Sequence, residues 1–138
     1  MTTFAEHEAA EIERFRDYLN TLTSIVNEAS DVFSKADGYF TADDFDGQLK
    51  AISTAKLEFK RSLKLGSLKK LEEDLYADLS NCLSPIRGPW LDGRERAELF
   101  LSDDYRFGAA FIKLCIADAR RRLSAYEQKP SDFLANGA

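Results

Sequence analysis

Apolar residues recur at alternating intervals of three and four positions near the start of the chain, and this spacing constrains the fold more than any other feature. The pattern runs from Ile12 to Phe33 and is typical of a long amphipathic helix that packs along one face. A second stripe with the same intervals runs from Phe45 to Leu63. A strand would instead show a period of two. The stripes therefore predict two long helices, the first over residues 3–34.

Glycine and capping residues mark where the first helices begin and end. Gly38 is expected to end the first helix, and Thr41 supplies the hydroxyl of an N-cap for the second. Ser67 is expected to cap a third helix that reaches Leu83. One continuous helix kinked at Gly66 stays open as an alternative.

Two prolines mark the one clear irregular loop, over residues 84–90. Pro85 and Pro89 exclude a regular helix there. A short helix is predicted over about residues 93–101, and Ser102 is then expected to cap the final helix.

The final helix contains the most apolar stretch of the chain, residues 105–126. Its apolar side chains cover about 200° of the helix circumference, twice the width usual for a surface helix, so we predict that it is the central helix. The chain of 138 residues has only seven glycines and three prolines. We predict an all-α, single-domain helical bundle of four main helices plus one short helix over residues 1–128, with residues 129–138 as a flexible tail.

Cysteine usage and hydropathy indicate the compartment. Cys82 and Cys115 fall on apolar helix faces, and we predict two buried thiols rather than a disulfide. The first residues lack the basic and apolar regions of a secretory signal. Because no apolar run approaches the roughly 18–20 residues that span a bilayer, we expect a cytoplasmic protein without a membrane partner.

Catalytic and metal-binding patterns are missing from the sequence. His7 is the one histidine, and no CxxC pair, nucleophile motif or glycine-rich phosphate loop accompanies it. Residues 34–45 resemble the calcium loop of an EF-hand, but Phe33 and Lys35 fall where that loop requires oxygen ligands. We therefore expect a protein without enzymatic activity and without a cofactor.

Charge is distributed in blocks along the chain. Residues 1–46 carry 11 acidic and three basic side chains, a net charge of −8, whereas residues 47–71 carry one acidic and seven basic side chains, a net charge of +6. We expect these blocks to face each other on neighbouring helices or to be solvated. Alternatively, the acidic block could bind a basic target such as a nucleic-acid-handling enzyme. Its candidate residues are Glu6, Glu8, Glu11 and Glu13.

The second helix also presents a basic surface. Four cations lie within roughly 100° of one another on a helical wheel. They are Lys50, Lys60, Arg61 and Lys64. Such a surface could contact phosphates without reading a base sequence. A nucleic-acid-binding regulator that uses residues 50–70 is therefore the alternative to protein binding.

Other basic residues have local explanations. Lys56 replaces an apolar residue in the second stripe, and we expect its stem to pack while its ammonium group reaches solvent. A run of three arginines ends at Arg122, four residues after Asp118, and this spacing predicts an ion pair between the two side chains.

The proline loop carries the only tryptophan of the chain, Trp90, three residues after Arg87. Tryptophan and arginine are enriched at binding hot spots. We expect Trp90 to close one end of the bundle. An exposed Trp90 would instead make this loop the first choice for a partner site, because a proline-restricted loop loses little entropy on binding.

These observations together predict a non-catalytic protein-binding module, such as an adaptor, a chaperone-like factor or an inhibitor. The heptad stripes could also extend to a second copy of the chain and give a homodimer.

Overall fold

The computed structural model describes residues 4–35, 41–63 and 66–128, and these residues form helices and turns without a strand. The all-α prediction, with four main helices and one short helix, is confirmed. The α-helices are α1 (Phe4–Lys35), α2 (Ala42–Ser62), α3 (Lys69–Leu83), α4 (Gly93–Phe100) and α5 (Gly108–Gln128), and two 3-10 turns, η1 (Gly66–Leu68) and η2 (Ser84–Ile86), flank α3.

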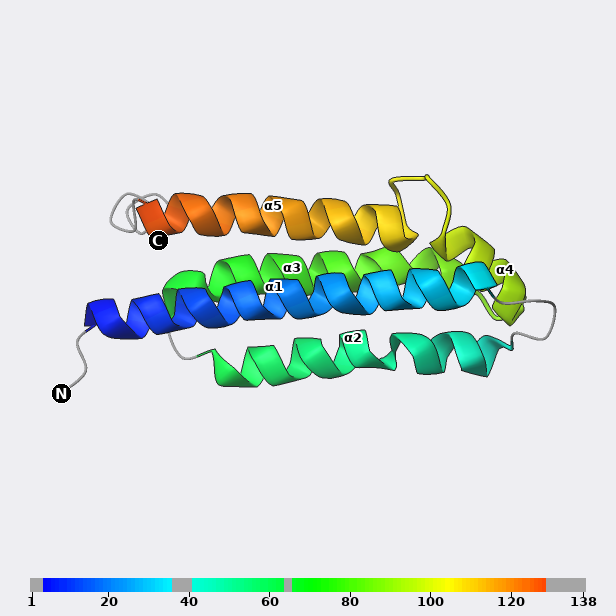
Figure 1. Cartoon of the computed structure of the whole chain (residues 1–138), viewed down its shortest axis with the longest axis horizontal. Coiled ribbons are helices and arrows are strands. Elements are labelled where there is room, and N and C mark those ends of the chain that lie inside the picture. Colours follow the sequence, from blue (N-terminus) through cyan, green and yellow to red (C-terminus); the bar gives the residue numbers. More distant parts are fainter. Residues whose placement is uncertain (1–3, 36–40, 64–65, 129–138) are drawn as a thin grey trace.

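The four long helices run alternately up and down the bundle (Figure 1). In this view α1 lies between α2 and α5, and α3 lies behind it. The helix α5 packs against α1, α3 and α4, and α1 packs against α2, α4 and α5, so α1 and α5 share the central position. The backbone of α2 comes less close to α3 than to α1, which leaves a wider seam between α2 and α3.

Both heptad stripes lie in the core, as their spacing predicts. The stripe of α1 is buried from Ile12 to Phe33, and α2 buries Phe45, Leu49 and Phe59 against it. The positions that could have paired with a second copy therefore pack within the chain itself. None of the helices in the described ranges is long and apolar enough to cross a membrane.

Capping chemistry sets the start of α2. The Thr41 hydroxyl accepts a hydrogen bond from the backbone N–H of Asp44 at 3.1 Å, and the Asp44 carboxylate accepts one from the backbone N–H of Thr41 at 2.9 Å. This reciprocal pair is a capping box, so the predicted cap is confirmed. Gly38 and the rest of residues 36–40 in the EF-hand-like segment lie outside the described residues.

The connection between α2 and α3 differs from both predictions. The helix α2 ends at Ser62, because Leu63 is extended, and α3 begins only at Lys69 after the 3-10 turn. A continuous kinked helix is therefore wrong. The N-cap position of α3 belongs to Leu68 and not to Ser67.

The start of α5 was also predicted wrongly. Residues 101–107 form turns, in which the Ser102 hydroxyl accepts a hydrogen bond from the backbone N–H of Asp104 at 3.2 Å. The helix begins at Gly108, whose φ is +71°. A β-carbon at Gly108 would lie 2.7 Å from the carbonyl oxygen of Phe100, so the chain reversal requires glycine.

The two cysteines are buried and free, as predicted. Cys82 lies on α3 and Cys115 on α5. Burial raises the pKa of each thiol to about 12. Since the thiolate is the reactive form, both side chains act as inert core residues near neutral pH.

Candidate protein-binding site

Trp90 lies on the surface, with 79% of its side chain exposed. The expectation that it closes one end of the bundle is therefore wrong. Phe45, Phe100 and Ile86 are fully buried at that end, and the indole is not among the side chains that pack there. No other large hydrophobic side chain in the described part of the chain is as exposed as this one.

Local turns project Trp90 from the connection between α3 and α4. Pro85 lies in the first turn of η2, and Ile86 anchors the turn in the core. The backbone N–H of Leu91 then donates to the carbonyl oxygen of Gly88 at 3.1 Å. This hydrogen bond closes a four-residue turn that holds Trp90 at its third position.

The absence of a side chain at Gly88 makes room for the indole. A β-carbon built on Gly88 would lie 2.8 Å from both Cε2 and Cζ2 of Trp90. The indole therefore occupies the space that a side chain at residue 88 would need. In this position the ring lies close to the Gly88 backbone while most of its surface stays in solvent.

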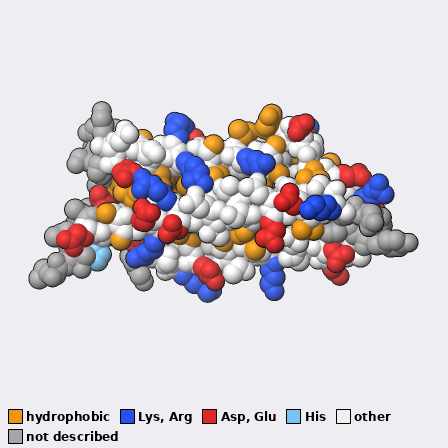
Figure 2. Space-filling view, viewed as in Figure 1, with side chains coloured by type: hydrophobic (Ala, Val, Ile, Leu, Met, Phe, Trp, Pro, Cys, Tyr) orange, Lys and Arg blue, Asp and Glu red, His pale blue; other side chains and the backbone are white. Residues whose placement is uncertain are grey.

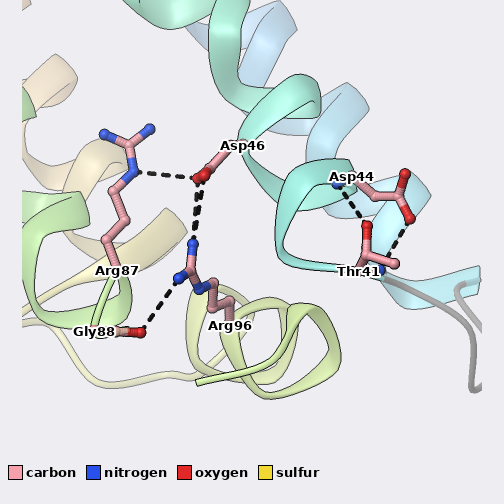
Figure 3. Close-up of polar contacts among 6 residues, drawn as sticks. All are labelled: Thr41, Asp44, Asp46, Arg87, Gly88 and Arg96. Carbon is pink, nitrogen blue, oxygen red and sulfur yellow. Dashed lines mark hydrogen bonds and ion pairs between the residues drawn. The ribbon is translucent and has the colours of Figure 1, made fainter. Parts of the chain in front are cut away.

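Asp46 on α2 holds the loop through two arginines (Figure 3). Its Oδ1 lies 3.4 Å from Nη1 of Arg96 and 3.6 Å from Nε of Arg87. Arg96 is buried, and its Nη2 donates to the carbonyl oxygen of Gly88 at 3.2 Å. One carboxylate thus connects α2, α4 and the turn beneath Trp90.

Arg87 presents a second recognition group next to the indole loop. Its side chain is 40% exposed, and its terminal nitrogens point away from Asp46 in Figure 3. These nitrogens can donate to a carboxylate or to backbone carbonyls of a partner. An apolar ring and a planar donor group on one restrained loop suit binding rather than bond breaking.

The acidic candidates do not form one exposed face. Glu6 and Glu13 are exposed, Glu8 is partly exposed, and Glu11 is only 2% exposed. Glu13 pairs with Arg16 at 3.3 Å, and Glu11 lies 3.8 Å from Arg14. Across the face in Figure 2, acidic and basic side chains are interspersed. A role for these glutamates in recruiting a basic target stays a prediction, and Glu11 is not accessible to a partner.

Three of the basic candidates are exposed residues of α2. Lys50, Lys60 and Arg61 are exposed, whereas Lys64 lies outside the described residues. Lys56 is partly buried, and its ammonium group lies over the Tyr76 ring rather than extending freely into water. Nucleic-acid binding by this surface stays a prediction.

The arginine run of α5 is engaged with neighbouring helices. Arg122 pairs with Asp74 of α3 at 3.0 Å, so the predicted pair with Asp118 is wrong. Asp118 pairs with Arg121 instead. Arg120 donates to the side-chain oxygen of Asn20 on α1 at 3.0 Å. The run therefore serves the packing of α5 more than it offers a charged surface.

An open groove of about 430 Å³ between α1, the 101–107 turns and α5 was not predicted. The groove is lined by residues that include Ser30, Leu101, Tyr105, Ala109, Lys113 and Leu114. A helix that started at Ser102 would not form these turns. Gly108, a glycine within the expected helix, was the sequence feature that could have indicated them.

No three His, Cys, Asp or Glu side chains among residues 4–35, 41–63 and 66–128 gather where they could hold a metal ion. Comparisons with protein-family models, with curated protein sequences and with solved structures find no match to this chain. The Trp90 loop is the strongest candidate site that the described residues of this chain form.

Proposed function

We propose that this chain is a non-catalytic protein-binding module whose principal contact is the Trp90 loop. The observation that carries this proposal is the exposed indole on a loop that Asp46 holds through Arg87 and Arg96. An exposed tryptophan costs solvation free energy in the isolated chain, and a partner that covers it removes that cost. The restrained loop loses little conformational entropy when it binds.

The pairing of Trp90 with Arg87 favours a partner with an apolar pocket beside an acidic or carbonyl-rich rim. Truncating a hot-spot tryptophan typically costs about 2 kcal/mol or more of binding free energy, which corresponds to roughly a thirtyfold weaker Kd. Arg87 is partly neutralised by Asp46, so its removal should cost less than removal of Trp90.

The test is capture of binding proteins from native lysate by the tagged chain, identification by mass spectrometry, and measurement of Kd with each purified partner. Trp90→Ala should weaken binding at least tenfold, and Arg87→Ala should weaken it less. Tyr105→Ala is the matched control, because Tyr105 is an aromatic residue with 66% of its side chain exposed on another connection. Circular dichroism should show that all three variants stay folded.

Two outcomes would count against the proposal. Equal affinity of the Trp90→Ala variant and the parent chain would remove the loop as the contact. Loss of binding only in the Tyr105→Ala variant would assign the contact to the groove beside α5.

A further inference from the structure

The seam between α2 and α3 contains a cluster of polar side chains that the proposed protein-binding function does not use. The backbones of these helices stay farther apart than those of α1 and α2. Lys56 and Lys60 project from α2 into this space, and Tyr76 and Ser80 project from α3. The cluster therefore bridges two helices through side chains rather than through close backbone packing.

Two ammonium groups converge on a single aromatic ring. Nζ of Lys56 lies 4.5 Å from the centroid of the Tyr76 ring, and Nζ of Lys60 lies 4.8 Å from the same centroid. Nζ of Lys56 also donates to the Ser80 hydroxyl at 3.1 Å, and that hydroxyl donates onward to the carbonyl oxygen of Tyr76 at 3.0 Å. Lys56 is thus held in place and keeps two N–H donors for another acceptor.

The cluster has an excess of positive charge. In the part of the chain that the structure describes, no carboxylate forms an ion pair within 4 Å of Lys56 or Lys60. Burial lowers the pKa of the Lys56 ammonium group, and the charge of Arg87 lowers it further. Cations brought this close without an ion-paired carboxylate are stabilised when an anion binds between them.

Glu72 of α3 lies close enough to Lys60 for the two charges to interact. Its side chain is buried, and among the described residues it forms no ion pair with Lys56 or Lys60 within 4 Å. Asp46 is engaged by Arg87 and Arg96. Neither carboxylate is therefore paired directly with the two lysines.

We infer that the α2–α3 seam binds a phosphate group, with Lys56 and Lys60 as the two principal cations. Lysine ammonium groups are suited to phosphate because they act as compact point charges with several donors. A group with two negative charges, such as a phosphate monoester or pyrophosphate, matches the two lysines.

A compact site fits the arrangement better than a long track for a nucleic-acid backbone. Lys70, farther along the basic region, is already paired with Asp74 at 3.0 Å. Lys50 and Arg61 are exposed and have no contact with Tyr76 or Ser80. The convergence is thus confined to one turn of α2 and the facing turn of α3.

Calorimetric titration of the full chain with inorganic pyrophosphate, at constant ionic strength set by sodium chloride, tests this site. We expect saturable binding at one site. Lys60→Met and Lys56→Met should each weaken binding about tenfold or more, as loss of a charge-assisted contact does. Lys113→Met is the control, because it removes one exposed lysine from α5 and should leave the affinity unchanged.

The exposed Lys60 keeps the test valid if the Lys56→Met variant does not fold. Absence of pyrophosphate binding would overturn the inference, and so would equal weakening by Lys113→Met.

A second titration with a single-stranded oligonucleotide separates the sources of phosphate. Oligonucleotide binding that depends on Lys50 and Arg61, without pyrophosphate binding, would replace the compact site with a nucleic-acid surface. Pyrophosphate binding that is unaffected by Lys50→Met supports the compact phosphate site.

Discussion

The two ends of the bundle contain aromatic clusters of similar size but different surroundings. At the α4 end, the Phe33 ring lies 5.1 Å from both the Phe45 and Phe100 rings, and all three side chains are buried. At the opposite end, Phe59 lies 4.8 Å from Phe15 and stacks on Tyr18 at 4.3 Å. These distances join ring centroids.

Ionisable groups distinguish the second cluster from the first. Burial raises the pKa of the Tyr18 hydroxyl, and the nearby Glu72 raises it further. The three phenylalanines at the α4 end carry no ionisable group themselves. The comparison indicates an aromatic cluster of apolar rings at the α4 end, whereas the stability of the other end is expected to depend on pH.

The largest change in stability is expected when one ring is removed from each aromatic cluster. Phe100→Ala should lower the free energy of unfolding by about 3–5 kcal/mol, because it leaves a closed cavity. Phe59→Ala should cost about 1 kcal/mol less than Phe100→Ala, because Phe59 borders an open groove between α1 and α2 that water can enter. Urea unfolding followed by circular dichroism measures both values. Equal losses would show that the two ends are packed alike.

A smaller effect is expected at the chain reversal of the α4 end. Gly108→Ala should destabilise the fold by about 1–3 kcal/mol, because φ is positive and the added carbon meets a backbone oxygen. Gly47 is the matched control, since a β-carbon there meets nothing within 4 Å. Gly47→Ala should stabilise α2 by about 0.5–1 kcal/mol. If Gly108→Ala left the free energy of unfolding unchanged, the result would contradict the assigned turn.

The smallest effect concerns pH at the polar end. Burial raises the pKa of Glu72, although Lys60 opposes the shift. A carboxyl with a higher pKa in the folded chain favours folding when protonated, so its contribution declines as pH rises through and above its ordinary value. Glu72→Gln should therefore stabilise the chain more at pH 7 than at pH 4. Urea unfolding at both pH values checks this.

The matched control for Glu72 is its exposed neighbour, Glu73. Glu73→Gln should change the stability by a similar small amount at both pH values. If the two variants respond to pH in the same way, the polar end does not carry the pH dependence assigned to it.

Much of the core could be predicted from the sequence because a heptad stripe defines a buried face without knowledge of its partner. Ile12 and Phe33 are at the ends of one such stripe, and both are buried. Thr41 was equally predictable, because its partner Asp44 lies three residues away.

The wrong predictions share one physical cause. In each case a contact with another part of the chain decides between two arrangements that the local sequence allows. Ser102 followed by acids suits a helix N-cap as well as a turn, and only the approach of Gly108 to Phe100 selects the turn. Arg122 could choose between Asp118 on its own helix and Asp74 on α3, and packing decided it. Trp90 is exposed, whereas Phe33 and Phe45, which lie far from it in sequence, are buried at that end of the bundle.

The exposure of the single tryptophan also gives the chain an intrinsic optical probe. An indole in water emits at long wavelength, and its emission shifts when it becomes enclosed. Because Trp90 is exposed in the folded chain, unfolding should change its emission little, whereas enclosure by a partner should shift it to shorter wavelength. The fluorescence of this protein should therefore report whether its loop is covered and give little information on whether the bundle is folded.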